Sequence, residues 1–417
     1  MKKCFAFFLF VALIAVTPAS KASSVDTAKP EDVGLSSERL QRIHQSIQRH
    51  IDAGDISGAV TLVARRGRIA HFEVHGLMDI DSKRPMSKDA IFRIASMTKP
   101  VTATAIMMLV EEGKIRLTDP VSKFIPEFKD MKVAVPKEGA RGQAPAPNSA
   151  PPFYTVPASR EITIRDLLSH VSGLASGPMS NSEAAKVARK PNEVLADYIP
   201  RLGMTPLEFQ PGSRWSYSPG AGFDTLGRIV EVISGQTFDQ FLRQRVFEPL
   251  GMKDTFFSAE DRMARLATIY QKTEKGLQKP ANPNQTTSTK YFSGAGGLMS
   301  TAEDYVQFGQ MLLNGGQLNG KRLLSPKTVE LMSSVHVPDT LPGRPRGRGF
   351  GLSVQVVSDA VAANFRVSDG SYGWDGAFGT HFWVDPKEKI VGVLMIQTSN
   401  PEIWRDFENA VMQAIVE

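Results

Sequence analysis

The chain of 417 residues contains a single cysteine, Cys4, which lies within a predicted leader at the start of the sequence. Once that leader is removed no cysteine remains, and this excludes disulfides, thiol nucleophiles and cysteine-ligated metals together. Aromatic residues make up only 8% of the chain, and none is interleaved with its one local basic cluster at Arg344, Arg346 and Arg348. Nucleic-acid binding is therefore not expected, and we interpret the cluster as a solvated loop rather than an anion site.

Two catalytic patterns are also missing. The sequence has no Gly-x-Ser-x-Gly, the nucleophile elbow that an α/β-hydrolase requires. Its seven histidines, at positions 44, 50, 71, 75, 170, 336 and 381, form no His-Glu-x-x-His pattern, so neither a metal nor a cofactor is expected. His71 and His75 fall on an expected strand. We interpret His170 and His381 as hydrogen-bonded structural residues.

The first 22 residues predict a cleavable export signal. Two lysines precede an apolar stretch from Cys4 to Val16, and small residues follow at positions 20 and 22. The apolar stretch is too short to span a bilayer, which takes about 20 residues. Removing the leader with its three lysines leaves 46 basic and 43 acidic residues, a net charge of +3 instead of +6. We expect an exported protein, periplasmic or secreted, without a membrane span after processing.

Apolar periodicity predicts strands near both ends of the chain and helices between them. Helices are expected over 36–53, 101–110, 223–233 and 300–313, and in a last segment with apolar residues at 403, 407, 411 and 415. Strands are expected over 59–64, 69–74, 378–384 and 390–397. Ser300 and Glu303 form a capping-box pattern, and residues 135–160, rich in Pro, Ala and Gly, predict a surface loop. This order indicates a mixed α/β fold with one sheet built from both chain ends.

The strongest chemical signal is Ser96-Met97-Thr98-Lys99 at the start of the apolar helix. A serine and a lysine three residues apart share one helix face, so the amine can reach the hydroxyl and help to remove its proton. The helix N-terminus adds partial positive charge where an acyl oxyanion would form. We interpret Ser96 as a catalytic serine.

Two later strings add candidate groups. In Trp215-Ser216-Tyr217-Ser218-Pro219-Gly220, a tyrosine near Ser96 and Lys99 could carry the proton. Its ordinary pKa is about 10, and an adjacent ammonium favours the phenolate. The glycines of 373–380 precede a strand and permit close backbone approach to a ligand, so an N–H there could complete an oxyanion hole. Taken alone, the first string also fits a packed turn and the second a simple turn.

Together with the segments 162–174, 293–316 and 376–386, these strings resemble the serine β-lactamase and penicillin-binding-protein superfamily, particularly its class C and family VIII carboxylesterase branch. The resemblance implies one catalytic unit over 30–417 with an antiparallel sheet formed by both chain ends and flanked by helices. An α/β lobe of 30–90 plus 295–417 would carry an inserted, mainly helical lobe of 91–294. The family's SxxK motif is matched by Ser96 and Lys99, and its tyrosine motif by Tyr217.

This chain departs from the β-lactamase pattern at two positions. Pro219 stands where β-lactamases carry an asparagine, and it offers no side-chain amide. The KTG-type triplet is occupied by Trp374, Asp375 and Gly376, so the cation that faces a β-lactam carboxylate is missing. Asp375 would also disfavour anionic substrates by like-charge repulsion. Both departures resemble the family VIII esterases and favour ester hydrolysis.

The resemblance implies acyl transfer in two steps on a small-molecule ester or amide. Tyr217 and Lys99 would deprotonate Ser96, and the backbone N–H groups of Ser96 and Ala377 would hold the oxyanion. The substrate would contact the triplet that begins at Trp374. Two alternatives stay open: a β-lactamase or D-amino-acid peptidase or amidase of the same superfamily, and a non-catalytic relative that binds cell-wall peptides.

Overall fold

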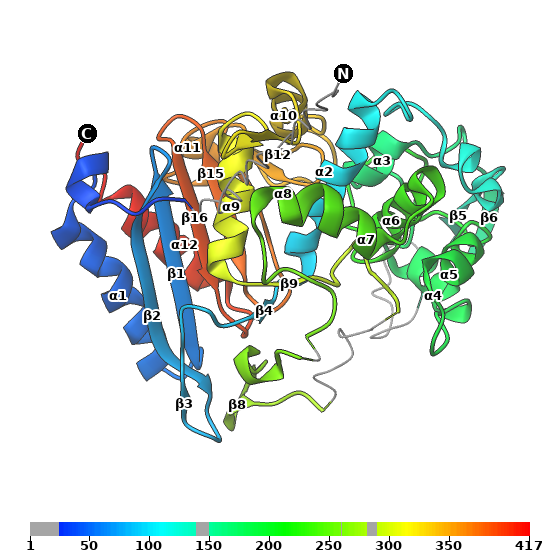
Figure 1. Cartoon of the computed structure of the whole chain (residues 1–417). Helices are drawn as coiled ribbons and strands as arrows, with labels where there is room; N and C mark the ends of the chain where they lie inside the picture. The colour runs from blue at the N-terminus through cyan, green and yellow to red at the C-terminus, as the bar shows by residue number, and fades with distance from the viewer. Residues whose placement is uncertain (1–24, 139–149, 260, 282–289) are drawn as a thin grey trace, which may run out of the picture.

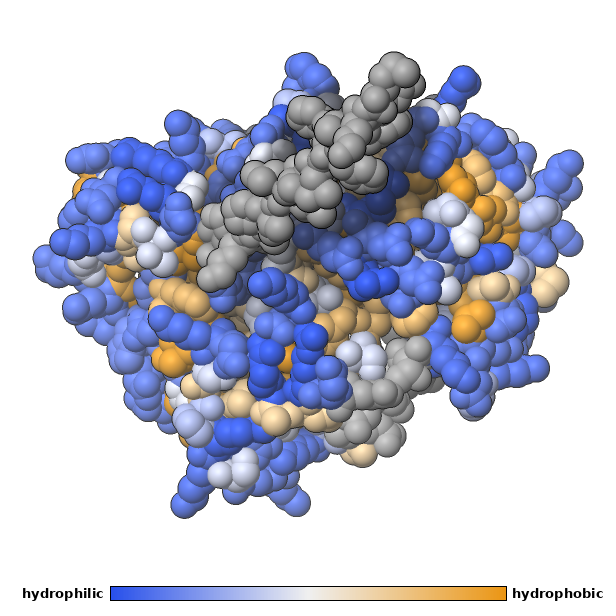
Figure 2. Space-filling view, viewed as in Figure 1, coloured by the Kyte–Doolittle hydropathy of each residue, from blue (hydrophilic) through white to orange (hydrophobic). Residues whose placement is uncertain are grey.

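The computed structural model describes residues 25–138, 150–259, 261–281 and 290–417. The predicted leader lies outside these residues. Within them, no helix combines the length and the apolar character needed to cross a membrane. Hydrophilic side chains cover most of the face shown in Figure 2.

An antiparallel sheet of eight strands is built from both ends of the chain (Figure 1), in the order β12-β13-β14-β15-β16-β1-β2-β3. Its strands are β1 Gly58–Arg65, β2 Arg68–Asp79, β3 Arg84–Pro85, β12 Arg348–Phe350, β13 Gln355–Val357, β14 Tyr372–Asp375, β15 His381–Asp385 and β16 Ile390–Met395. The pairing of β1 with β16, with Val60 opposite Met395, joins the two chain ends. The predicted sheet is therefore confirmed.

The strand predicted over 378–384 begins later, at His381. The Gly376 N–H donates to the Thr380 carbonyl at 2.7 Å, and the Gly379 N–H donates to the Gly376 carbonyl at 2.9 Å. Gly379 has a φ of +95°, a conformation that favours glycine. A tight turn thus occupies 376–380 and leaves β14 close to the start of the buried central helix.

Helices cover both faces of the sheet. On one face, α1 Ser37–Asp52 and α12 Pro401–Met412 pack on the strands and on each other, and α9 Ala302–Leu313 packs against β1, β15 and β16 from the other face. The predicted helices are confirmed, but the cap of α9 is shifted. Thr301, not Ser300, accepts a hydrogen bond from the Asp304 N–H, at 3.2 Å. Ser300 belongs to a short strand and its hydroxyl contacts Thr255.

A mainly helical region lies beside the sheet (Figure 1). Its helices are α2 Thr98–Glu111, α3 Ile164–Leu168, α4 Pro178–Lys186, α5 Leu195–Leu202, α6 Ala221–Ser234, α7 Phe238–Leu242 and α8 Glu248–Leu250. Every residue of α2 from Thr98 to Leu109 is buried, as its apolar sequence predicts. The smaller elements are β4 Phe92–Arg93, β9 Met299–Ser300, β7 Gln271–Thr273, β8 Gly276–Gln278, β10 Gln317–Leu318, β11 Lys321–Arg322, α10 Pro326–Ser333 and α11 Ala360–Ala363.

Two sequence interpretations are wrong in part. The ends of the predicted 135–160 loop pair as a hairpin of β5 Lys132–Pro136 and β6 Phe153–Pro157, while its middle, 139–149, lies outside the described residues. In the basic cluster only Arg346 is exposed. The guanidinium groups of Arg344 and Arg348 stack over Trp215 and Phe365, 4.5 and 4.4 Å from the ring centroids. Planar guanidinium groups pack on aromatic faces, which a charge count alone does not show.

Candidate active site

Ser96 lies in a single turn of 3₁₀ helix, Ala95–Met97, directly before α2. Ala95 has a φ of +43°, in the left-handed region, which costs a non-glycine residue about 1–3 kcal/mol. The chain at Gly376 packs closely against this turn, because a Cβ there would clash with the Ile94 carbonyl and the Thr380 side chain. The Ser96 backbone is therefore held in place against the end of β14.

Lys99, in the first turn of α2, is fully buried. Its Nζ lies 3.1 Å from Ser96 Oγ, 2.9 Å from the Pro219 carbonyl oxygen and 2.8 Å from the Ala295 carbonyl oxygen. Burial lowers the pKa of Lys99 to about 7, and the nearby charge of Asp224 opposes that shift. When the amine is neutral, its two hydrogens serve the two carbonyls and its lone pair faces Ser96 Oγ.

Tyr217 completes the group around the serine. Its hydroxyl donates to Ser96 Oγ at 2.6 Å, and its ring packs on Trp374 and His170 with centroid separations of 5.6 and 4.7 Å. Burial raises the pKa of Tyr217, so the expected phenolate is wrong. Desolvation penalises the anion, and Lys99 is itself shifted toward its neutral form. Tyr217 is a phenol poised to donate, and Lys99 is the better base.

Sequence reasoning missed the support around Lys99. The prolyl residue at 219 supplies a backbone carbonyl to the lysine amine. Asp224, buried on α6, accepts hydrogen bonds from Tyr291 Oη at 2.7 Å, Ser293 Oγ at 2.6 Å and the Ala295 N–H at 3.0 Å. Asp224 thereby fixes the segment that contains Ala295, whose carbonyl oxygen accepts a hydrogen bond from Lys99. The available signal was an acid beside Phe223 at the start of the apolar stretch 223–233, although Glu231 in the same stretch is a second acid.

A cavity of about 360 Å³ opens at Ser96. It is lined by Ser96 together with Arg189, Pro219, Tyr291, Ala295, Ala377 and Phe378. Its size suits a small organic ligand. Among the described residues, none accepts a hydrogen bond from the Ala377 N–H, which leaves this donor available at the cavity wall. The structure thus brings together Ser96, Lys99, Tyr217 and Ala377.

The triplet Trp374, Asp375 and Gly376 does not line that cavity. Trp374 packs behind Tyr217, while Asp375 contacts His381 Nδ1 at 2.5 Å. Burial opposes a charge on His381, but Asp375 and Glu408 outweigh it and raise the pKa of His381 to about 10. The charge of Asp375 is therefore compensated by an imidazolium, and the expected repulsion of anionic substrates loses its physical basis.

The two histidines interpreted as structural are both hydrogen-bonded. Nδ1 of His170 accepts from the Ser218 N–H at 3.2 Å, and His381 lies between two carboxylates. Burial holds the pKa of His170 well below its usual range. His170 is thus a neutral ring that packs behind Tyr217 and positions it.

Comparisons with known proteins agree with this geometry. The Beta-lactamase family model matches residues 43–414. Protein Rv1367c of Mycobacterium tuberculosis (strain ATCC 25618 / H37Rv) is 39% identical over 371 residues, covering 84% of this chain and 88% of that protein. Esterase EstB of Burkholderia gladioli is 29% identical over 406 residues, covering 91% and 95%. The solved structure of EstCE1, a hydrolase with promiscuous acyltransferase activity, superposes with a TM-score of 0.74 at 27% identity, covering 90% of this chain and 99% of that one.

Proposed function

Because this chain belongs to the Beta-lactamase family and is a serine hydrolase, we propose that it cleaves carboxylic esters of small acyl groups through an acyl-enzyme on Ser96. The resemblance drawn from the motifs is confirmed at the level of the family and its fold. One observation carries the proposal: Ser96 Oγ lies within hydrogen-bond distance of both the buried Lys99 amine and the Tyr217 hydroxyl.

Acylation starts with the neutral Lys99 amine, which takes the proton of Ser96 as Oγ attacks the ester carbonyl carbon. The carbonyl oxygen becomes an oxyanion held by the N–H groups of Ser96 and Ala377, and each such donor contributes about 3 kcal/mol to the transition state. Tyr217 then gives its proton to the departing alcohol and regains one from the Lys99 ammonium. Both side chains return to their starting protonation states.

Deacylation repeats these steps with water. Lys99, through Tyr217, removes a proton from the attacking water, and the oxyanion forms again in the same position. Collapse of the second intermediate breaks the bond between the acyl carbon and Ser96 Oγ. The proton held by Lys99 returns to Ser96, and the carboxylic acid leaves.

Three features support an ester substrate over a β-lactam. Pro219 offers the substrate no side-chain amide, and Trp374 carries no cation at the position of the β-lactamase lysine. An alcohol is also a better leaving group than an amine, so its departure depends less on protonation. The names of EstB and EstCE1 as an esterase and a hydrolase agree with this choice. Arg189 at the cavity is the feature that could still hold a carboxylate.

The test compares kcat/KM of the protein without its leader for p-nitrophenyl butyrate, nitrocefin and a peptide ending in D-Ala-D-Ala. Ser96→Ala serves as the blank, and Ser334→Ala, at the end of α10, is a matched serine control. We expect fast ester turnover, negligible turnover of the other two substrates, and full activity in the control. Faster turnover of nitrocefin would reassign the protein as a β-lactamase, and its loss in Arg189→Ala would identify the cation responsible.

We also propose that the first 22 residues direct export. Their charge and apolar pattern support this proposal. Expression of the full chain in a Gram-negative host, followed by fractionation and N-terminal sequencing, should find a shortened protein in the periplasm or medium. A full-length chain retained in the cytoplasm would contradict it.

A further inference from the structure

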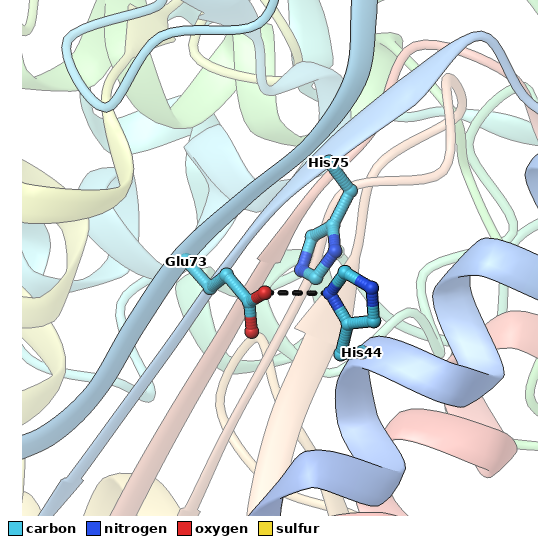
Figure 3. Close-up of side chains that lie close together, drawn as sticks. All are labelled: His44, Glu73 and His75. Atoms are coloured by element: carbon cyan, nitrogen blue, oxygen red, sulfur yellow. Dashed lines mark hydrogen bonds and ion pairs between the residues drawn. The ribbon is translucent and has the colours of Figure 1, made fainter.

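Two histidines and a glutamate from one helix and one strand meet on one face of the sheet (Figure 3). His44 comes from α1, whereas Glu73 and His75 lie two residues apart on β2 and so point to the same side of that strand. His44 Nδ1 is 2.6 Å from Glu73 Oε1. One candidate ligand atom from each of the three residues lies within 4.8 Å of the others. No local motif joins His44 to β2, which is why the sequence predicted no metal centre.

The inner member of this cluster has an unsatisfied ring nitrogen. His75 is only 3% exposed, and its Nδ1 has no hydrogen-bond partner among the described residues. A buried polar atom without a partner costs about 1–3 kcal/mol. The ion pair between His44 and Glu73 does not relieve this cost, because it leaves His75 Nδ1 unpaired. A ligand from outside the chain that binds His75 Nδ1 would relieve this cost.

Thr61 fixes the orientation of His75. Its Oγ1 lies 3.0 Å from His75 Nε2 and 2.8 Å from His71 Nε2. A hydroxyl has one proton, so Thr61 donates to one imidazole and accepts from the other. When it accepts from His75, the proton of that ring is on Nε2 and a lone pair is on Nδ1. Outer hydrogen bonds of this kind hold metal-binding histidines in the ligating tautomer.

The outer side of the cluster is open. The side chains of His44 and Glu73 are 51% and 38% exposed, and both line a surface cavity of about 470 Å³ with Gln41 and Gln45. Tetrahedral zinc at about 2.0–2.1 Å from each ligand atom separates those atoms by about 3.4 Å. Small rotations of the two exposed side chains can bring the three ligand atoms to that separation. Water from the cavity can then supply the fourth ligand.

We propose that His44, Glu73 and His75 bind a divalent transition-metal ion, with zinc as the expected occupant. Two imidazoles and one carboxylate form a recurrent zinc ligand set. The ion would tie α1 to β2. Since the apolar residues of α1 and Met97, the neighbour of Ser96, belong to different core clusters, the proposed role of the ion is to stabilise the contact between α1 and the sheet.

Isothermal titration of the metal-free, tag-free protein with zinc chloride tests this proposal, with thermal unfolding as a second readout. We expect one zinc per chain and a higher Tm with zinc present. His44→Ala should abolish both effects and still fold, because its side chain is half exposed. Thr61→Val should weaken binding by about 10- to 100-fold, because it removes the outer hydrogen bond without removing a ligand.

His336→Ala is the matched control and should leave binding unchanged, since His336 contacts the Leu331 carbonyl oxygen and is not a member of this cluster. Esterase activity reports folding in every variant and is expected to persist. Absence of zinc binding in the wild-type protein would overturn the proposal. So would binding that is unchanged in both His44→Ala and His75→Ala, because the ion would then be held elsewhere.

Discussion

At the scale of single residues, the site depends on which group near Ser96 is free to accept a proton. Lys99 has no carboxylate partner at salt-bridge distance among the described residues, and two backbone carbonyls hold its amine. Carbonyl dipoles stabilise an ammonium less than a carboxylate does, so burial dominates and the pKa falls to about 7. The pKa of Tyr217 is raised instead, which favours its neutral phenol. In the proposed mechanism these shifts favour Lys99 as the base and Tyr217 as the proton donor.

The pH profile follows from this assignment. Because the active form of Lys99 is neutral, kcat/KM for p-nitrophenyl butyrate should rise with pH and level off above its pKa of about 7. Lys99→Arg keeps a basic side chain, but guanidinium does not deprotonate in proteins, so activity should fall by at least about 10³-fold at every pH. A profile that falls through this range, or an active Lys99→Arg variant, would contradict the assignment.

Tyr217→Phe tests the proposed proton donation by the Tyr217 hydroxyl. The change removes the hydroxyl that lies 2.6 Å from Ser96 Oγ and keeps the ring that packs on Trp374. We expect kcat to fall by about 10²- to 10⁴-fold with a small change in KM, since the lost interaction acts mainly in the transition state. The deficit should shrink for esters of more acidic alcohols, which leave without protonation. An equal deficit for all alcohols would remove Tyr217 from the leaving-group step.

At the scale of elements, Lys99 is positioned by the contact between α6 and residues 291–295. Asp224 on α6 holds three donors from residues 291–295, and that segment presents the Ala295 carbonyl to Lys99. The two parts are some seventy residues apart in sequence, so no local pattern connects them. Asp224 is a positioning residue that also adds negative charge near the amine.

Asp224→Asn should change both properties. Its amide has one oxygen in place of two, so at least one of the three donors loses its partner and stability falls by about 1–3 kcal/mol. Loss of the negative charge lowers the pKa of Lys99 further, which moves the acid limb of kcat/KM to lower pH. Thermal unfolding and the pH profile measure the two effects, with Asp239→Asn on α7 as control. An acid limb that stays in place would separate Asp224 from the electrostatics of Lys99.

Charged side chains also link β14, β15 and α12. His381 bridges Asp375 on β14 and Glu408 on α12, and its pKa of about 10 lies above the value of about 6.5 in the unfolded chain. A raised pKa stabilises the fold fully below about pH 6.5, and the contribution is lost as pH rises through about 10.

His381→Gln should therefore cost about 1.5–3 kcal/mol at pH 6, as expected for losing hydrogen bonds to charged groups when one partner, Asp375, is partly exposed. The gap in Tm between wild type and variant should narrow toward pH 10. His336→Gln is the matched control and should show no such trend. A constant gap across this range would show that His381 stabilises the fold by packing alone.

At the scale of the whole molecule, periodic segments were predictable and long-range pairings were not. The apolar run of α2 and the spacing of Leu40, Ile43 and Ile47 on α1 indicated these helices correctly. The motif containing Ser96 and Lys99 placed both groups on one face of a helix start, where the structure also has them. Such signals are local, because a single helix or strand determines them.

The errors arise where tertiary structure decides. Ser300 and Thr301 both fit a capping pattern. Because β9 pairs with β4, Ser300 belongs to a strand, and Thr301 caps the helix instead. Charge counting placed Arg344 in solvent, because the sequence does not show that Trp215 lies beside it. The cluster of His44 with Glu73 and His75 likewise exists only once α1 packs on β2.

The most direct test of the central claim is to find the acyl group. The protein is mixed with p-nitrophenyl butyrate, quenched with acid within one turnover and digested, and its peptides are mapped by mass spectrometry. We expect a single butyryl group on the peptide that contains Ser96, no such group in Ser96→Ala, and slower formation of the group in Lys99→Arg. A butyryl group on another residue, or turnover that continues in Ser96→Ala, would contradict the acyl-enzyme and with it the roles given to Lys99 and Tyr217.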